Sequence, residues 1–246
     1  MSKFWVLGNW KSNGRKADLV PFTKAFNAET TRESDEVTCG IALPFHLVTG
    51  AKTVKPMQVG AQNVSMFDEG AYTGEITAGM LEDMDTSFCL VGHSERRQYF
   101  GETVSDTEAK LHKLLATTIF PVFCIGETLA QRQGGLLEAV LRDQLSPVAA
   151  LEAGPLAIAY EPVWAIGTGV AATPADVAQA HGMIRGILDE TACANAPILY
   201  GGSVKPMNAN DLAAIDEVGG FLVGGASLEG ASFANILNGF IQGKRL

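Results

Sequence analysis

Short runs of apolar residues recur along the chain, and most are continuous rather than alternating with polar residues. Eight such runs begin near residues 4, 37, 57, 88, 119, 156, 197 and 220. Consecutive starts are roughly 20 to 40 residues apart, which is the length of one strand–helix unit. Continuous apolar runs are typical of parallel strands that are covered on both faces. The pattern therefore predicts eight parallel strands.

The segments between these runs show helical periodicity and recognisable start signals. Ser105 is followed three residues later by Glu108, a capping-box pattern that predicts a helix beginning at this serine. Thr173 precedes Pro174, and together they predict an N-cap and a first helical position. Residues 127–145 also have a helical pattern, but a Gly-Gly pair interrupts it.

Eight strands that alternate with helices form either a closed (β/α)8 barrel or a doubly wound open sheet. Eight units within 246 residues match the barrel. The chain contains no Pro/Ser-rich linker and no run of charges that would divide it. We therefore expect an α/β protein with a single (β/α)8 barrel domain over residues 1–246.

Composition and charge limit the partners. Apolar residues make up 47% of the chain, and the formal net charge is −9. This charge argues against nucleic acid or an anionic membrane surface as a partner, and a small anion needs a local positive site. The N-terminal residues lack a cleavage site, and the apolar run over residues 114–126 is too short and too interrupted by proline to span a bilayer. We expect a cytoplasmic protein.

The four cysteines are Cys39, Cys89, Cys124 and Cys193, which are widely spaced and lie in apolar surroundings. No C-x-x-C pair occurs, so zinc and thioredoxin-like sites have little support. We expect reduced, buried thiols and no metal site.

Barrels of this class carry their chemistry at the carboxyl ends of the strands. Polar residues and glycines follow most of the apolar runs, and each is a candidate: Asn9, Lys11, Asn63, His93, Glu127, Glu161, Ser203, Gly224 and Gly225. Any one of them can be an ordinary polar loop residue. The whole set is harder to explain in that way.

Lys11 and Asn9 follow the first run. A lysine here is either a solvated cation or a point charge that holds an anionic substrate in a negatively charged protein. Asn9 lies beside it and can donate or accept a hydrogen bond.

His93 ends the fourth run and precedes a predicted helix, with Ser94 as its N-cap and Glu95 in its first turn. A helix N-terminus disfavours imidazolium, so a neutral His93 could polarise a carbonyl group. The alternative is a histidine satisfied by local hydrogen bonds. Arg96 and Arg97 are expected on a solvated face of that helix, with ion pairing as the second possibility.

Glu161 is the candidate base. A carboxylate next to Trp164 and Ile166, in a site that could close, becomes more basic as water leaves. The following stretch, PVWAIGTG, begins with Pro162 and ends with small residues from Gly167, a composition that suits a moving lid. A glycine-rich turn with a surface tryptophan is the alternative.

Glycine pairs follow the last two runs, in YGGSV from Tyr200 and VGGAS from Val223. Glycines let backbone N–H groups approach an anion closely, and barrels often bind phosphate at these strands. We therefore expect a phosphate site here.

The stretches GNWKSN, GHSERR, CIGET, AYEPVWAIGTG, YGGSVKP and VGGASL together resemble the motifs of the triosephosphate isomerase family, in the same order and over essentially the whole chain. The resemblance implies interconversion of dihydroxyacetone phosphate and D-glyceraldehyde 3-phosphate through an enediolate, without metal or organic cofactor. It makes Glu161 the base and His93 the electrophile.

The same resemblance implies further site residues. Lys11 and Asn9 would orient and stabilise the substrate, and Glu95 would support Lys11 or the catalytic groups. The phosphate would be held by groups of the remaining motif residues, Gly167, Ser203, Gly224 and Gly225.

Residues Val64–Met80 form a long connection for such a barrel. They resemble the loop that docks into a second subunit in this family, where a threonine that corresponds to Thr73 approaches the partner's active site. A homodimer is therefore expected, and a free surface loop is the alternative.

Two other functions stay open on the residues alone. One is a different phosphosugar-processing barrel enzyme, against which the Glu161 motif argues. The other is a phosphosugar-binding protein without turnover, which the presence of Lys11, His93 and Glu161 together makes a poor fit.

Overall fold

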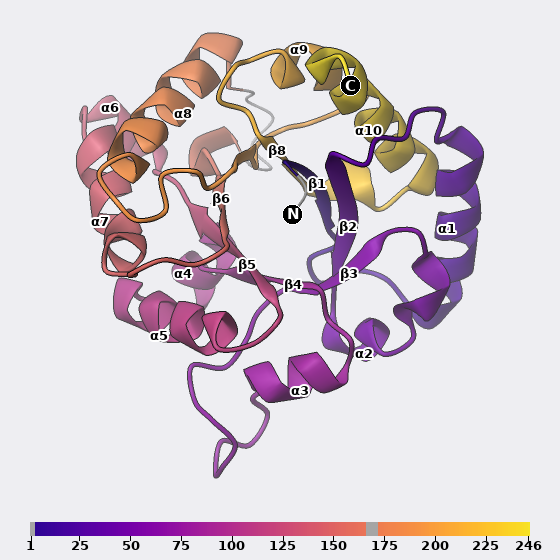
Figure 1. The fold of residues 1–246 in the computed structure, drawn as a ribbon, viewed down its shortest axis with the longest axis horizontal. Helices are drawn as coiled ribbons and strands as arrows, with labels where there is room; N and C mark the ends of the chain where they lie inside the picture. Colours follow the sequence, from indigo (N-terminus) through magenta and orange to yellow (C-terminus); the bar gives the residue numbers. More distant parts are fainter. Residues whose placement is uncertain (1–2, 166–171) are drawn as a thin grey trace.

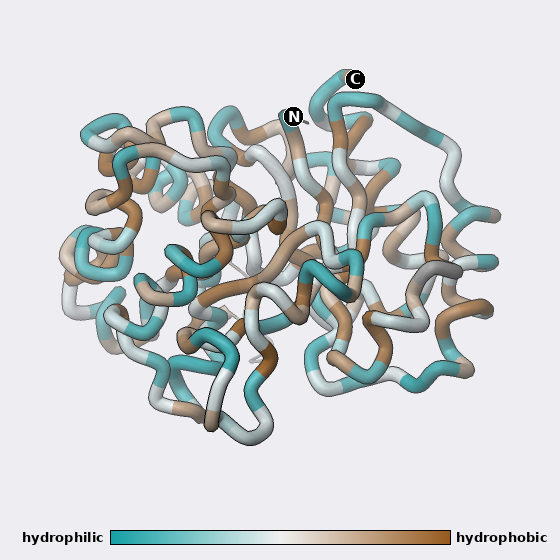
Figure 2. The backbone as a smooth tube through the Cα atoms, turned by 60° about the horizontal axis from the view of Figure 1, so that its bottom comes forward, coloured by the Kyte–Doolittle hydropathy of each residue, from teal (hydrophilic) through white to brown (hydrophobic). Residues whose placement is uncertain are grey.

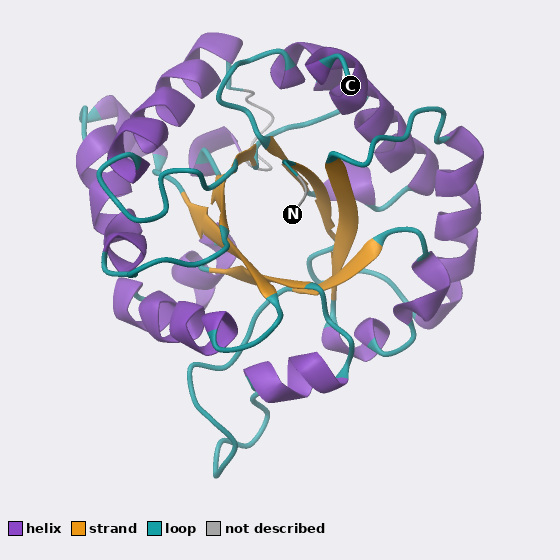
Figure 3. Cartoon of the chain, viewed as in Figure 1, coloured by secondary structure: helices purple, strands orange, loops and turns teal. Residues whose placement is uncertain are grey.

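The computed structural model describes residues 3–165 and 172–246, and its strands form one closed parallel barrel in which each strand pairs with the next along the chain. The barrel closes where Trp5 pairs with Gly220, so the last strand joins the first. Helices surround the strands on the outside (Figures 1 and 3). The strands are β1 Phe4–Asn9, β2 Val37–Leu43, β3 Gln58–Ala61, β4 Phe88–Val91, β5 Phe120–Ile125, β6 Ala157–Tyr160, β7 Ile198–Tyr200 and β8 Gly220–Val223. This confirms the (β/α)8 barrel and excludes the open sheet.

Each strand begins within one residue of the start predicted from the apolar runs. The reason is burial on both faces. The strand residues of β4, β6, β7 and β8 are all buried, so no polar position is required within them.

The buried apolar side chains form two clusters. Figure 2 shows that hydrophobic and hydrophilic stretches alternate along the backbone. Leu7, Leu90 and Leu199 belong to a smaller cluster of strand residues, while a larger cluster packs the strands against the helices. The core thus fixes the positions of the strand ends, where the functional groups lie.

The helices vary in length, and short ones are frequent at the strand–helix connections. They are α1 Lys16–Glu29, α2 Phe45–Val48, α3 Ala78–Asp83, α4 Ser94–Phe100, α5 Val104–Leu115, α6 Leu129–Gln133, α7 Leu137–Ala149, α8 Pro174–Leu188, α9 Ala209–Ala213 and α10 Gly230–Lys244, with 3-10 turns η1 Ala51–Val54, η2 Val163–Ala165 and η3 Gly225–Ser227.

The predicted start of α5 is wrong by two residues. The N-cap is Thr103, whose side chain accepts from the backbone N–H of Asp106, while the Asp106 carboxylate accepts from the backbone N–H of Thr103. Thr103 and Asp106 form a capping box as good as the predicted pair of Ser105 and Glu108, and the earlier box begins the helix first.

The other two helix predictions come out differently. Thr173 and Pro174 begin α8 as predicted, and Asp176 completes the capping box. The helical pattern over residues 127–145 corresponds to two helices rather than one, the whole of α6 and most of α7. Gly135, at φ +69°, makes the turn between them.

All four cysteines are free thiols. Cys89, Cys124 and Cys193 are buried, and Cys39 is partly exposed. Burial raises the pKa of Cys39, Cys89 and Cys124. Over the part of the chain that the structure describes, no helix is long and apolar enough to cross a membrane, and no group of His, Cys, Asp and Glu side chains could hold a metal ion.

Candidate active site

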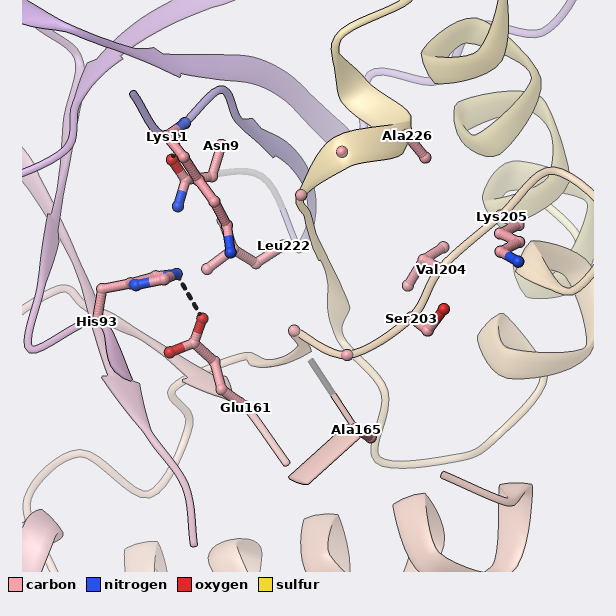
Figure 4. Close-up of a pocket in the computed structure, with 14 residues that line it drawn as sticks. Asn9, Lys11, His93, Glu161, Ala165, Ser203, Val204, Lys205, Leu222 and Ala226 are labelled. Atoms are coloured by element: carbon pink, nitrogen blue, oxygen red, sulfur yellow. Dashed lines mark hydrogen bonds and ion pairs between the residues drawn. The ribbon is translucent and has the colours of Figure 1, made fainter. Parts of the chain in front are cut away.

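A cavity of about 260 Å³ lies at the carboxyl ends of the strands. Figure 4 shows His93 and Lys11 directed toward Glu161, with Ser203 and Lys205 on the opposite wall. The residues around the cavity come from five strand ends or the loops that follow them: Asn9, Lys11, His93, Glu161, Ala165, Gly201, Gly202, Ser203, Val204, Lys205, Leu222, Gly224, Gly225 and Ala226.

Glu161 directly follows β6 and is 2% exposed. Its Oε1 lies 2.8 Å from Nε2 of His93, and its Oε2 accepts a 2.9 Å hydrogen bond from the backbone N–H of Ser94. Two glycines make room for it: a Cβ on Gly126 would overlap the Glu161 backbone, and a Cβ on Gly201 would lie 2.9 Å from its Cγ. The carboxylate is therefore held in one position at the edge of the cavity.

His93 is the N-cap of α4, where Ser94 was predicted, so that prediction is wrong. Its Nδ1 accepts a 3.2 Å hydrogen bond from the backbone N–H of Glu95. The bond needs a lone pair on Nδ1, so it selects the neutral tautomer that carries its proton on Nε2. That proton points at Glu161.

The electrostatics of His93 and Glu161 are coupled. Burial lowers the pKa of His93, but the charge and hydrogen bond of Glu161 outweigh it and hold this pKa above its usual value. Burial raises the pKa of Glu161, but His93 and the Ser94 N–H outweigh it and hold this pKa below its usual value. A ligand that draws Glu161 away removes the main cause that raises the pKa of His93, and burial then favours the neutral imidazole.

Lys11 has φ of +51°, a left-handed backbone conformation that is strained for a lysine by about 1–3 kcal/mol. Three neighbours hold it there. Asn9 Oδ1 accepts from the Lys11 N–H at 2.9 Å, and Gln62 donates to the Lys11 carbonyl at 2.8 Å. The Nζ atom donates to Glu95 Oε1 at 2.6 Å. The strained backbone thus directs a partly buried cation into the cavity.

Gly224 and Gly225 follow β8 at the cavity wall. Within the described parts of the chain, their backbone N–H groups donate to no acceptor. A Cβ on Gly225 would meet no atom within 4 Å, so a side chain at this position would fill part of the cavity. Ser227 fixes this turn, because its hydroxyl and N–H both bind the Gly224 carbonyl at 2.8 Å and its own carbonyl accepts from the Trp10 indole. The turn can cradle a phosphate.

The family model for triosephosphate isomerase matches residues 4–240. Two relatives named triosephosphate isomerase are similar over nearly their whole length. The protein from Francisella philomiragia is 43% identical over 242 residues, which cover 95% of each chain. The protein from Azoarcus sp. strain BH72 is 44% identical over 239 residues, which cover 94% of this chain and 96% of that one.

The chain belongs to the triosephosphate isomerase family. The predicted resemblance is thereby confirmed. The fold on which this family is built, the closed barrel, is also the one described above.

Not every strand-end residue reaches the cavity of this triosephosphate isomerase family member. Glu127 is fully buried but lies outside it, and its carboxylate accepts hydrogen bonds from Tyr160, Trp164 and Arg132 at 2.8 to 3.2 Å. The indole N–H of Trp164 needs an acceptor, and Glu127 supplies one.

Asn63 also lies outside the cavity, and it accepts a 2.8 Å hydrogen bond from Lys110. Lys110 and Arg96 each donate to Glu102 at 2.6 Å, so the ion-pair alternative is confirmed for the partly buried Arg96. Arg97 departs from the prediction of a solvated face. It turns inward and donates to the carbonyls of Gly92 and Cys124.

The remaining predicted site residues divide as follows. Asn9, Lys11, His93, Glu161, Ser203, Gly224 and Gly225 surround the cavity, and Glu95 contacts it through Lys11. Gly167 lies outside the described residues. Sequence reasoning missed Gln62 and Ser227, whose contacts with Lys11 and Trp10 join residues far apart in the chain.

Proposed function

We propose that Glu161 is the base and His93 the electrophile of the reaction that this isomerase catalyses, the interconversion of dihydroxyacetone phosphate and D-glyceraldehyde 3-phosphate. The observation that carries the assignment is one small cavity lined by a buried carboxylate, a histidine N–H, a lysine ammonium and backbone N–H groups that have no acceptor among the described residues. This arrangement matches a substrate with a carbonyl group at one end and a phosphate at the other.

Glu161 removes the proton from the carbon next to the substrate carbonyl, and the electron pair moves into an enediolate. The Nε2–H of His93 and the ammonium of Lys11 donate to the two oxygens as negative charge develops there. His93 gives its Nε2 proton to the former carbonyl oxygen and takes up the proton of the substrate hydroxyl group, so the hydroxyl proton moves from one oxygen to the other. Glu161 then returns the proton to the neighbouring carbon. Before the first step, Glu161 exchanges its hydrogen bonds with His93 and Ser94 for contact with the substrate carbon.

The phosphate binds at the turn after β8. The N–H groups of Gly224 and Gly225 and the Lys11 ammonium provide donors, with Ser203 on the opposite wall. Gly167 contributes a further donor in this proposal. Glu95 acts through Lys11, because its carboxylate holds the ammonium at 2.6 Å.

The test is incubation with dihydroxyacetone phosphate in D₂O, followed by proton NMR. We expect D-glyceraldehyde 3-phosphate to form and deuterium to appear on the carbons that exchange protons with Glu161. Absence of both product and deuterium uptake refutes the function. Product without deuterium uptake refutes proton transfer through an exchangeable carboxyl group.

We also infer a homodimer through the loop Val64–Met80, with Thr73 next to the partner's active site. The loop extends away from the barrel in Figure 1. Its shape is supported by a stack of Phe67 on Tyr72, with ring centroids 4.0 Å apart, and by a backbone bond from Ser65 to Ile76. Exposed apolar side chains of the loop and of α4 support a contact surface: Tyr72, Met80, Tyr99 and Phe100.

Sedimentation at micromolar concentration tests this inference. We expect a dimer for the natural chain and a monomer for Thr73→Arg, since an arginine at the loop tip obstructs docking. Thr31→Arg is the control, because Thr31 is exposed and lies outside the loop Val64–Met80, and this variant should remain dimeric. A natural chain that is monomeric and fully active contradicts the inference.

The single domain over residues 1–246, the cytoplasmic location and a role in glycolysis or gluconeogenesis remain predictions. Fractionation of cells and growth of a deletion strain on sugars and on three-carbon substrates would test the last two.

A further inference from the structure

A second cavity, of about 490 Å³, shares Glu161 with the active site. We call it the side cavity. Residues of α4, of the segment after β5 and of η2 line it, and α4, α6 and α7 lie along the same side of the barrel in Figure 1. Its volume is within the range of cavities that bind small molecules.

Arg97 supplies the side cavity with a positive charge. Among the residues that the structure describes, Arg97 makes no ion pair, and its only hydrogen-bond partners are the carbonyls of Gly92 and Cys124. Burial is the largest influence on the pKa of Arg97 and lowers it, although the negative charges of Glu102, Glu161 and Asp143 act in the opposite direction.

The two hydrogen bonds of Arg97 start from Nε and Nη2, which form one edge of the planar guanidinium. The opposite edge, with both N–H groups of Nη1 and the second N–H of Nη2, has no acceptor among the described residues. This edge has the geometry that binds two oxygens of a carboxylate.

The other walls of the side cavity are partly apolar. Ile125, Leu129, Val163 and Trp164 line it, and Leu129 is 51% exposed, so the cavity reaches the protein surface there. A ligand that enters past Leu129 meets apolar side chains on its way to the guanidinium.

We propose that the side cavity binds a small monocarboxylate with an apolar body, whose carboxylate pairs with the free edge of Arg97. The ligand is an effector of the isomerase. Its chemistry differs from that of the substrate, since the active-site cavity offers backbone N–H groups and lysine for a phosphate.

Occupancy of the side cavity also bears on Glu161, and this part rests on the proposed function. Ser94, whose N–H holds Glu161 Oε2, lines the side cavity together with Val163 and Trp164 from the segment that follows Glu161. A ligand packed against this wall stabilises the position in which Glu161 stays on Ser94. Proton transfer needs Glu161 to leave that position, so the ligand lowers kcat.

The probe is 4-phenylbutyrate, and its neutral amide is the control. Isothermal titration in saturating inorganic phosphate, which occupies the active-site cavity, measures binding to the side cavity alone. We expect the carboxylate to bind and the amide to bind about tenfold or more weakly, because the amide cannot pair with a guanidinium. Equal binding of the two probes overturns the recognition by Arg97, and loss of 4-phenylbutyrate binding in phosphate overturns the site.

Leu129→Glu and Leu136→Glu form a matched pair of variants. Both leucines are 51% exposed at the start of a helix, but only Leu129 lines the side cavity. We expect Leu129→Glu to weaken 4-phenylbutyrate binding about tenfold or more by charge repulsion, and Leu136→Glu to bind as the natural chain does. Equal binding by both variants overturns the location.

Steady-state kinetics then test the link to Glu161. We expect 4-phenylbutyrate to lower kcat at saturating substrate in the natural chain and in Leu136→Glu. A rise in KM with constant kcat shows competition for the active site and overturns the mechanism. If the protein fails the D₂O test of its function, the binding experiments still decide whether the side cavity exists as a site.

Discussion

The ends of β5 and β6 each carry a buried carboxylate, and the two differ in their partners. Glu127, after β5, accepts from the phenol of Tyr160, the indole of Trp164 and the guanidinium of Arg132. Glu161, after β6, accepts from the Nε2–H of His93 and one backbone N–H, and it faces a cavity. Both are at most 2% exposed.

With the roles proposed above, burial alone does not make a base. Glu127 is held by three side chains, one of them charged, and none can leave without exposing an unsatisfied group. Glu161 has two donors, and its Nε2 partner can give its proton to a substrate oxygen instead. A carboxylate becomes a base where its donors are few and exchangeable and where space lies next to it.

The largest expected effect separates the two carboxylates by activity. Glu161→Gln should lower kcat by about 10³-fold or more, since the amide cannot accept the proton. Glu127→Gln should lower it by about tenfold at most, because Glu127 does not touch the cavity. Steady-state assays in both directions measure this, with phosphate affinity as the control for binding. An equal loss of kcat in both variants would contradict the proposal that Glu161, and not Glu127, is the base.

Stability should show the reverse order. Glu127→Gln should reduce the free energy of unfolding by about 3 kcal/mol, because it leaves the buried donors of Tyr160, Trp164 and Arg132 with one neutral acceptor. Glu161→Gln should reduce it by less than about 1 kcal/mol, since a Gln oxygen can still accept from Ser94. Urea denaturation of both variants provides the measurement. A greater loss of unfolding free energy in Glu161→Gln than in Glu127→Gln would contradict the conclusion that Glu127 is the more tightly held carboxylate.

His181 packs edge-on against Tyr160 and extends the comparison to a buried group with no carboxylate partner. Burial lowers the pKa of His181 to about 4. The unfolded state therefore binds more protons below pH 6.5, and stability falls as the pH decreases from about 6.5 to about 4. We expect His181→Gln to remove about 2.5 kcal/mol of the loss between pH 7.5 and pH 4.5. Urea denaturation at both pH values tests this, and an unchanged difference would exclude His181 as the cause.

Coupling between Glu161 and His93 gives a prediction that Glu127 does not share. Because Glu161 raises the pKa of His93 against the effect of burial, Glu161→Gln should lower this pKa below that of the natural chain. Glu127→Gln should leave it unchanged. NMR titration of the His93 ring in the two variants checks this, and an unaltered value in Glu161→Gln would show that the pair is not coupled.

The smallest effect concerns a single donor to Glu127. Tyr160→Phe should lower the free energy of unfolding by about 1 kcal/mol and leave kcat nearly unchanged, since Trp164 and Arg132 still bind the carboxylate. Thermal or urea denaturation measures the first, and the isomerase assay the second. A large fall in kcat would mean that Glu127 acts on the reaction through Tyr160.

The sequence alone determined the barrel and the reactive groups. Continuous apolar runs predict buried parallel strands because burial on both faces excludes polar positions, and the strand starts agree within one residue. Lys11, His93 and Glu161 were identifiable because each lies within two residues of the end of a strand, and the family motifs surround them. The start of α8 was likewise predictable, since Thr173, Pro174 and Asp176 are neighbours in the chain.

Only the tertiary structure decided which polar residues act and which hold others in place. Glu127 and Glu161 look alike in sequence, as do Arg96 and Arg97, and their partners lie up to 68 residues away. Gln62 supports Lys11 across 51 residues, and no local pattern marks it. Local patterns fix helices and strands because the forces that form them act between neighbours. The role of a buried charge depends on which donors the closed barrel brings to it.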